Sequence, residues 1–143
     1  GGIYVKQSFT NAGGEIQISG SSAKKYGGGI FVGHNFKHLG GKIEISNSSA
    51  AERGGGICVY DNFEHSRGKI EVSNSSAKNG GGICVYNNFT NSEGKIGISG
   101  SSAEKEGGGI YVKQSFTNSG GEIEISGSSA KQFGGQVALG AFL

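Results

Sequence analysis

The amino-acid sequence predicts an all-β protein, a right-handed parallel β-helix in which each turn of the coil is one repeat of about 27 residues. Two patterns within each repeat support this: runs of alternating polar and apolar residues, typical of half-buried strands, and glycine clusters, which suit sharp corners. A fixed period of this size is typical of a solenoid. The first apolar residue of the repeat recurs at steps of 27, 27, 26, 27 and 27 residues, as Ile3, Ile30, Ile57, Ile83, Ile110 and Val137.

The repeats occupy all 143 residues, so the chain is interpreted as one solenoid segment. Because like residues recur at like positions, neighbouring turns should pair in register as parallel strands, about 4.8 Å apart. Parallel crossovers are right-handed in nearly all proteins. The third unit lacks one residue, which we expect to be absorbed at the corner after its second alternating run. The units are 1–26, 27–53, 54–79, 80–106, 107–133 and a partial 134–143.

Each unit begins with glycines and a short run such as Ile3-Tyr4-Val5. Its first and third residues are always β-branched, which indicates the inward face of a strand, whereas the middle residue varies among Tyr, Phe and Cys and is expected to face outward. A phenylalanine then recurs in every unit, which predicts an aromatic column in the core. The column comprises Phe9, Phe36, Phe63, Phe89 and Phe116.

A second alternating run, such as Glu15 to Ser19, predicts a longer strand. It is followed by Gly or Asn and then Ser-Ser-Ala, where the invariant small alanine suits a tight inner corner. We therefore expect two clear strands per turn and a short third one at the Ser-Ser-Ala segment.

Composition excludes several classes of partner. The formal charge is only +2, with lysines and glutamates interspersed, so no basic block indicates a nucleic-acid partner. No apolar run approaches the roughly 18–20 residues that span a bilayer. Neither end resembles the polar cap that a solenoid requires. We therefore expect a segment of a longer rod, with no direct membrane insertion in this segment, whose ends associate with further repeats.

The residues favour neither catalysis nor metal binding. Polysaccharide lyases and hydrolases with this fold need clustered carboxylates and a positioned base, yet the chain has one aspartate, Asp61. The GGxGxDxUx rhythm of calcium-binding rolls is absent. His38 and His65 occupy equivalent places but lack a third ligand, so we expect exposed corner residues. The sequence predicts no catalytic residue, no metal site and no cofactor.

Two kinds of covalent modification remain as candidates. Cys58 and Cys84 hold equivalent places in adjacent units, so their Cα atoms should be close enough for a disulfide; a pair of stacked free thiols is the alternative. Asn47, Asn74 and Asn88 begin N-x-Ser/Thr sequons, and the first two should lie in the same exposed corner.

Aromatic residues form a candidate surface strip outside the first strands. Such a strip can bind sugars or another protein, or the rings can simply pack across strands and shield the sheet. The strip comprises Tyr4, Phe31, Tyr60, Tyr86 and Tyr111.

The repeated GGGI, the following phenylalanine unit and the N/G-S-S-A corner resemble the β-helix repeats of chlamydial polymorphic membrane proteins (polymorphic outer membrane protein type), also seen in large algal surface proteins. Here Gly replaces the Ala of the family's GGA motif, and Phe9-Thr10-Asn11 is FxN where the family has FxxN. The resemblance implies an autotransported adhesin with a β-helical passenger region.

From the repeats and this resemblance we expect a non-catalytic structural or adhesive segment of an extracellular or cell-surface glycoprotein, acting as a rod, spacer or filament component. Its partners would be further copies of the repeat, other surface proteins or glycans. The alternative is a carbohydrate-active or glycan-binding β-helix.

Overall fold

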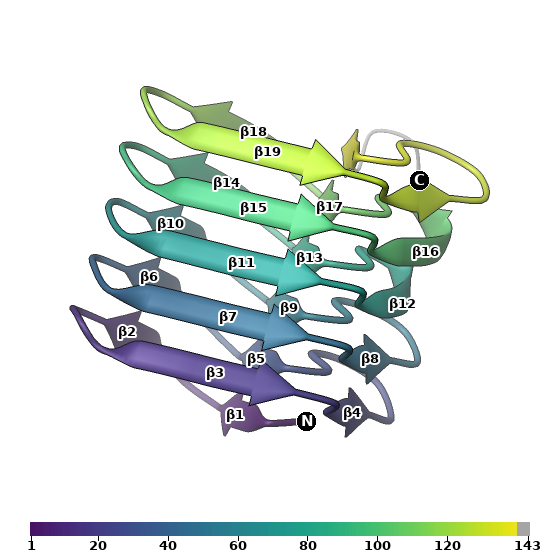
Figure 1. The fold of residues 1–143 in the computed structure, drawn as a ribbon, viewed down its shortest axis with the longest axis horizontal. Helices are drawn as coiled ribbons and strands as arrows, with labels where there is room; N and C mark the ends of the chain where they lie inside the picture. The colour runs from purple at the N-terminus through teal and green to yellow at the C-terminus, as the bar shows by residue number, and fades with distance from the viewer. Residues whose placement is uncertain (140–143) are drawn as a thin grey trace.

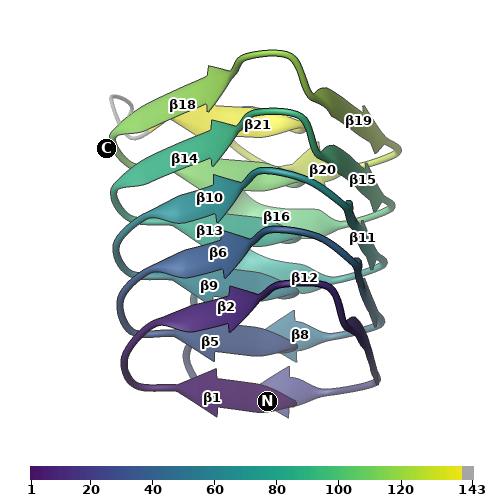
Figure 2. The same ribbon diagram turned by 90° about the vertical axis from the view of Figure 1, so that its left-hand side faces the viewer.

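The chain folds into a parallel β-solenoid of about five turns, built from strands that stack in four sheets (Figure 1). The computed structural model describes residues 1–139; the last residues of the partial sixth unit, 140–143, lie outside this range. Residues 1–139 contain no helix. Figures 1 and 2 together show that the coil is right-handed, so the predicted fold class is confirmed.

Sheets A and B contain the strands that begin each turn. Every neighbouring pair within them is parallel, and like residues face like. Sheet A consists of β1 (Ile3–Val5), β5 (Ile30–Val32), β9 (Ile57–Val59), β13 (Ile83–Val85), β17 (Ile110–Val112) and β21 (Val137–Leu139). Sheet B consists of β2 (Phe9–Asn11), β6 (Phe36–His38), β10 (Phe63–His65), β14 (Asn88–Asn91) and β18 (Ser115–Asn118).

Sheets C and D complete each turn. Sheet C has the longest regular strands, and sheet D leads back to sheet A (Figure 2). Sheet C consists of β3 (Glu15–Ser19), β7 (Lys42–Ser46), β11 (Lys69–Ser73), β15 (Lys95–Ser99) and β19 (Glu122–Ser126). Sheet D consists of β4 (Ser22–Ala23), β8 (Ser49–Ala50), β12 (Ser76–Asn79), β16 (Ser102–Glu106) and β20 (Ser129–Ala130).

The expectation of two clear strands and a short third is therefore corrected to four strands per turn. The phenylalanine that we placed after the first strand lies in a strand of its own, in sheet B. In the third turn the corner before it has the sequence Tyr60-Asp61-Asn62, without glycine, so the sequence carries no local breaker to mark the bend.

The shortened third unit keeps its register by losing a residue near the end of sheet D. Arg53 pairs with Asn79, and Asn79 pairs with Glu106. Arg53 follows Ala50 by three residues, whereas Asn79 follows Ala77 by only two, and the register shifts at this point. The residue is thus lost one strand later than we expected, beyond the Ser-Ser-Ala segment.

The interior is filled by the predicted apolar columns. The first and third residues of the sheet A strands and the apolar residues of sheet C point inward, and those of the middle turns are fully buried. The phenylalanine rings form one continuous stack with centroid spacings of 4.6–5.3 Å. In-register pairing therefore buries identical side chains against each other, which confirms the columns of Ile and Phe.

The glycine corner between sheets D and A is tight for two reasons. The first glycine of each cluster has a positive φ, 64° at Gly54. The second has no space for a side chain: a Cβ at Gly55 would lie 2.3 Å from the carbonyl oxygen of Gly81 and 2.4 Å from that of Ser76. The cluster thus brings the backbones of adjacent turns into direct contact.

Candidate binding surface

A layer of aromatic rings covers the outside of sheet A. Each of the first five turns contributes one ring, either from the middle of its sheet A strand or from two residues later. Tyr4, Phe31 and Tyr111 hold the first place and are followed by Lys6, Gly33 and Lys113; Cys58 and Cys84 are followed by Tyr60 and Tyr86. A small residue at one place is thus compensated by a ring at the other.

The segment that returns from sheet D to sheet A covers much of this layer. Tyr26, Arg53, Asn79 and Glu106 lie one above another in it. Beneath them Cys58 and Cys84 are fully buried, and Tyr111 is only 3% exposed. The prediction that the middle residues are exposed is therefore wrong for these three, because the returning segment packs over them.

The rings contact one another along the axis of the coil. Tyr60 stacks on Tyr86 with centroids 4.5 Å apart, and the guanidinium of Arg53 lies 4.9 Å from the Tyr86 centroid. The amino group of Lys113 lies 5.9 Å from that ring. In the upper turns the strip is therefore cross-strand packing that shields the sheet.

In the first three turns the same layer opens into a hollow. It has a volume of about 430 Å³ and is lined by Tyr4, Lys24, Lys25, Tyr26, Phe31 and Tyr60. We call this the aromatic hollow. Tyr4 stacks on Phe31 at 5.1 Å, and Tyr60 meets Phe31 edge to face at 5.3 Å. Of the lining residues, Tyr26 and the two lysines were not predicted as site residues.

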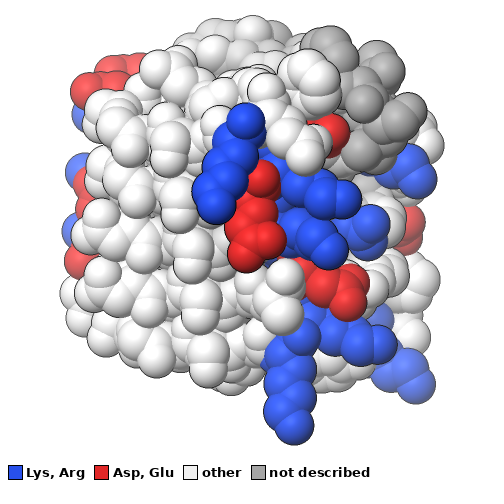
Figure 3. All heavy atoms as spheres, turned by 90° about the vertical axis from the view of Figure 1, so that its right-hand side faces the viewer, with Lys and Arg blue, Asp and Glu red and all other residues white. Residues whose placement is uncertain are grey.

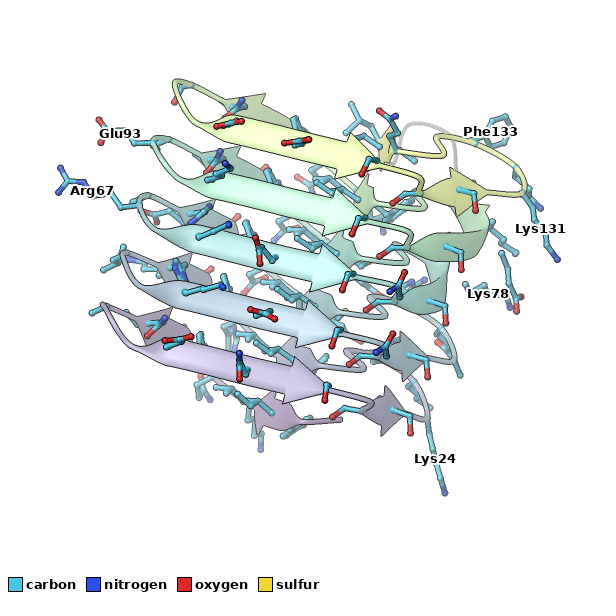
Figure 4. All side chains as sticks on the ribbon, in the orientation of Figure 1. Lys24, Arg67, Lys78, Glu93, Lys131 and Phe133 are labelled. Atoms are coloured by element: carbon cyan, nitrogen blue, oxygen red, sulfur yellow. The ribbon has the colours of Figure 1, made fainter. Side chains whose placement is uncertain are left out.

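Gly33 helps to keep the hollow open. It lies in the column that contains Lys6 and Tyr60, so the place where a side chain would stand beside Tyr60 is empty. A Cβ there would lie within 2.2 Å of the Lys6 carbonyl oxygen. Figure 4 shows Lys24 projecting from the same end of the molecule into solvent.

Burial changes the chemistry of the phenols and thiols beneath the returning segment. Burial raises the pKa of Tyr111 to about 12, with Glu106 adding to the effect. Burial, followed by a hydrogen bond with Tyr26, raises the pKa of Tyr60 well above its usual range. A hydrogen bond with Cys84 and burial raise the pKa of the Cys58 thiol. These groups therefore stay neutral at physiological pH.

The two cysteines face each other across β9 and β13 and are free thiols in this structure. Their in-register pairing places them where the sequence predicted, and a disulfide between them stays a prediction.

The histidines are buried, which corrects the expectation that they are exposed corner residues. His38 and His65 lie in register with centroids 4.9 Å apart and no solvent exposure. They share their column with Asn11, Asn91 and Asn118, each of which donates its Nδ2 hydrogen to the carbonyl three residues later. His38 Nε2 lies 3.1 Å from the equivalent carbonyl, that of Gly41. The shared role is to satisfy the corner between sheets B and C.

The charged residues of sheet C pair on the outer surface. Lys42 Nζ lies 3.0 Å from Glu44 Oε2, and Lys69 pairs with Glu71. The hydrogen bond from Lys69 lowers the pKa of Glu71. These exposed ion pairs contribute little stability individually. Among residues 1–139, no three His, Cys, Asp or Glu side chains are grouped to hold a metal.

Asp61 and Glu64, the carboxylates considered for catalysis, have separate partners. Asp61 Oδ2 lies 2.9 Å from His34 Nδ1, and its Oδ1 accepts a hydrogen bond from Asn87. Glu64 accepts a hydrogen bond from the hydroxyl of Ser66. Each interaction lies within one small polar group at the edges of sheet B.

Basic and acidic side chains gather on the side formed by sheet D and the returning segment (Figure 3). Exposed lysines there outnumber the exposed glutamate, Glu104; they are Lys24, Lys25, Lys78, Lys105 and Lys131. The aromatic hollow adjoins this basic side.

All three sequon asparagines are exposed. Asn47 and Asn74 occupy equivalent corners between sheets C and D, with φ of 52° and 51°, where the other turns have glycine at 61–64°. Asn tolerates this left-handed conformation better than most residues. Asn88 begins β14, and its side-chain oxygen accepts a hydrogen bond from Ser115. Their glycosylation stays a prediction.

Residues 1–139 include no helix with the length and apolarity to cross a lipid bilayer. Comparisons of this chain with protein-family models, curated proteins and solved structures found no match.

Proposed function

We propose that this chain is a non-catalytic rod segment of an extracellular or cell-surface protein, which acts as a spacer and presents its outer faces to partners. The observation that carries the proposal is the unbroken register: every turn repeats the same core residues at the same height, and the phenylalanine stack runs through all five units. Each added repeat therefore lengthens the molecule along one axis and leaves its cross-section unchanged.

The edges of the sheets support further copies of the repeat as partners. β1, β2, β3 and β4 lie at one edge of their sheets, and β18, β19 and β20 at the opposite edge of theirs. Unpaired strand edges favour pairing with another chain. Pairing of β19 with β3 of a second copy would place Glu122 beside Glu15, so such association should strengthen with salt.

Duplication of residues 27–106 tests the rod. A second copy inserted after Glu106 keeps the phase of the repeat and adds three turns, or about 14 Å, to the length. Small-angle X-ray scattering should show this increase in maximum dimension with an unchanged cross-sectional radius. An increase in all directions would contradict the rod. Antibody labelling of intact source cells tests the surface location; labelling only after permeabilisation would contradict it.

Glycan binding is the second candidate function, and the aromatic hollow favours it. Rings whose faces or edges remain open beside polar side chains are typical of sites that combine apolar contact with a few polar groups. Binding in this hollow is compatible with the rod, because it uses only the outside of the coil.

A further inference from the structure

We propose that the aromatic hollow binds an acidic polysaccharide, a chain of sugar rings that carry carboxylate or sulfate groups. The inference deepens the glycan-binding candidate and does not depend on the rod. It rests on the ring geometry of the hollow, on the two lysines at its rim and on the satisfied backbone beneath it.

The rings of the hollow are arranged for flat ligands that follow the axis. Tyr4 and Phe31 stack nearly parallel, with 12° between their planes, while Tyr26 and Tyr60 stand edge to face at 60°. Together they cover the first three turns, a length of about 10 Å. The C–H groups of a sugar ring carry partial positive charge and pack well on the negative face of an aromatic ring. The hollow thus offers apolar contact to more than one sugar unit.

The rim supplies positive charge that no neighbour neutralises. Lys24 and Lys25 are both exposed, and the ion pairs among residues 1–139 involve neither of them. The nearest acidic residue along the returning segment is Glu52, whose amide donates a hydrogen bond to the carbonyl of Lys25. Two lysines beside apolar walls favour a ligand that is anionic as well as ring-shaped.

A peptide suits the hollow less well than a sugar chain. Extended peptides gain much of their affinity by adding a strand to an open sheet edge. Here β1, β5 and β9 pair with one another in a continuous parallel ladder beneath the rings. The backbone under the hollow therefore offers few free donors or acceptors, and recognition must come from rings and lysines.

Calorimetric titration of the intact chain tests the proposal with four probes: oligogalacturonate, dextran sulfate, neutral dextran and polyglutamate. We expect the two acidic glycans to bind and neutral dextran to bind at least about tenfold more weakly, a difference of about 1.4 kcal/mol. Binding of dextran as tight as that of the acidic glycans would overturn the anionic ligand. Polyglutamate as tight as oligogalacturonate would overturn the sugar, and binding by no probe would overturn the site.

The repeat supplies matched variants. Lys24→Gln with Lys25→Gln should weaken oligogalacturonate binding by about tenfold or more, whereas Lys131→Gln, at the equivalent place four turns away, should not (Figure 4). Phe31→Leu should abolish binding, and Tyr86→Leu, a ring outside the hollow, should preserve it. Unchanged thermal unfolding confirms that the lysine variants fold. Equal losses in the Lys24/Lys25 and Lys131 variants would mean diffuse charge attraction and would overturn the proposal, and scattering would still report on the rod separately.

Discussion

The column that contains His38 and His65 shows how one position can be filled by different residues for the same purpose. Asn and His both place a ring or amide nitrogen against the carbonyl that ends the corner, three residues later. The histidines add a cost, because Nδ1 of each is buried without a hydrogen-bond partner. A buried imidazole must stay neutral, so burial lowers the pKa of His38 to about 4 and also lowers that of His65.

The low pKa values predict acid lability. The unfolded histidines bind protons near pH 6.5, whereas folded His38 binds one only near pH 4. The unfolded state therefore holds more protons in between, and the free energy of unfolding should fall as pH drops from about 6.5 towards 4, by up to about 3 kcal/mol for His38. Urea unfolding at pH 7.5 and pH 4.5 measures the change.

The asparagines of the same column supply the variant for this test. His38→Asn with His65→Asn introduces the residue that the other turns use, so the fold should persist and the fall in stability between the two pH values should shrink. An equal fall in the parent and the double variant would assign acid lability to other groups and contradict the role of the pair.

At the scale of one strand or corner, the glycines separate into positions that need them and positions that do not. Gly55 holds a corner where a Cβ would meet two carbonyl oxygens at 2.3 and 2.4 Å. Gly97 lies in β15, where the outward column has Gln17, Glu44, Glu71 and Glu124, and a Cβ there would meet nothing closer than Glu71 Cγ at 3.9 Å.

Alanine at these two glycines should therefore have opposite effects. Gly55→Ala forces the adjacent turns apart and should destabilise the protein by about 1–3 kcal/mol or prevent folding. Gly97→Ala restrains the unfolded chain without a clash and should be neutral or stabilise by about 0.5–1 kcal/mol. Thermal unfolding of both variants decides the matter; equal destabilisation would mean that the corner does not require backbone contact between turns.

The elements that the sequence predicted best are those with a strong pattern. The alternation in Glu15 to Ser19 and its repeats defined sheet C, and the period of 27 defined the stacking. Sheet B was missed because three-residue strands are too short to show a period and their corner lacks a breaker. The aromatic hollow was only half predicted, since Tyr4, Phe31 and Tyr60 were named but Lys24, Lys25 and Tyr26 were not.

That omission has a physical cause. The sequence between Ala23 and Gly27 shows no periodicity, so nothing local says that it folds back over sheet A. The signal that could have revealed it is the exchange of positions: where Cys58 or Cys84 replaces a ring, a tyrosine appears two residues later. Such compensation is expected only where side chains share a packed space, and it indicates a covering layer outside the sheet.

For the whole molecule, the central claim is that one repeat makes one turn and that turns stack in register. Each residue should then contact its equivalent 27 residues away, except across the third unit, where the separation is 26. Ile43 pairs with Ile70, and Ile70 pairs with Ile96. A hairpin or sandwich built from the same strands would instead join neighbouring strands of one unit.

Nuclear Overhauser contacts between backbone protons of adjacent strands measure this directly. The account predicts parallel-strand contacts that join residues of β7 to residues of β11 at a separation of 27, and residues of β11 to residues of β15 at a separation of 26. Antiparallel contacts between β5 and β7 within one unit, or a separation that stays at 27 through the third unit, would contradict it.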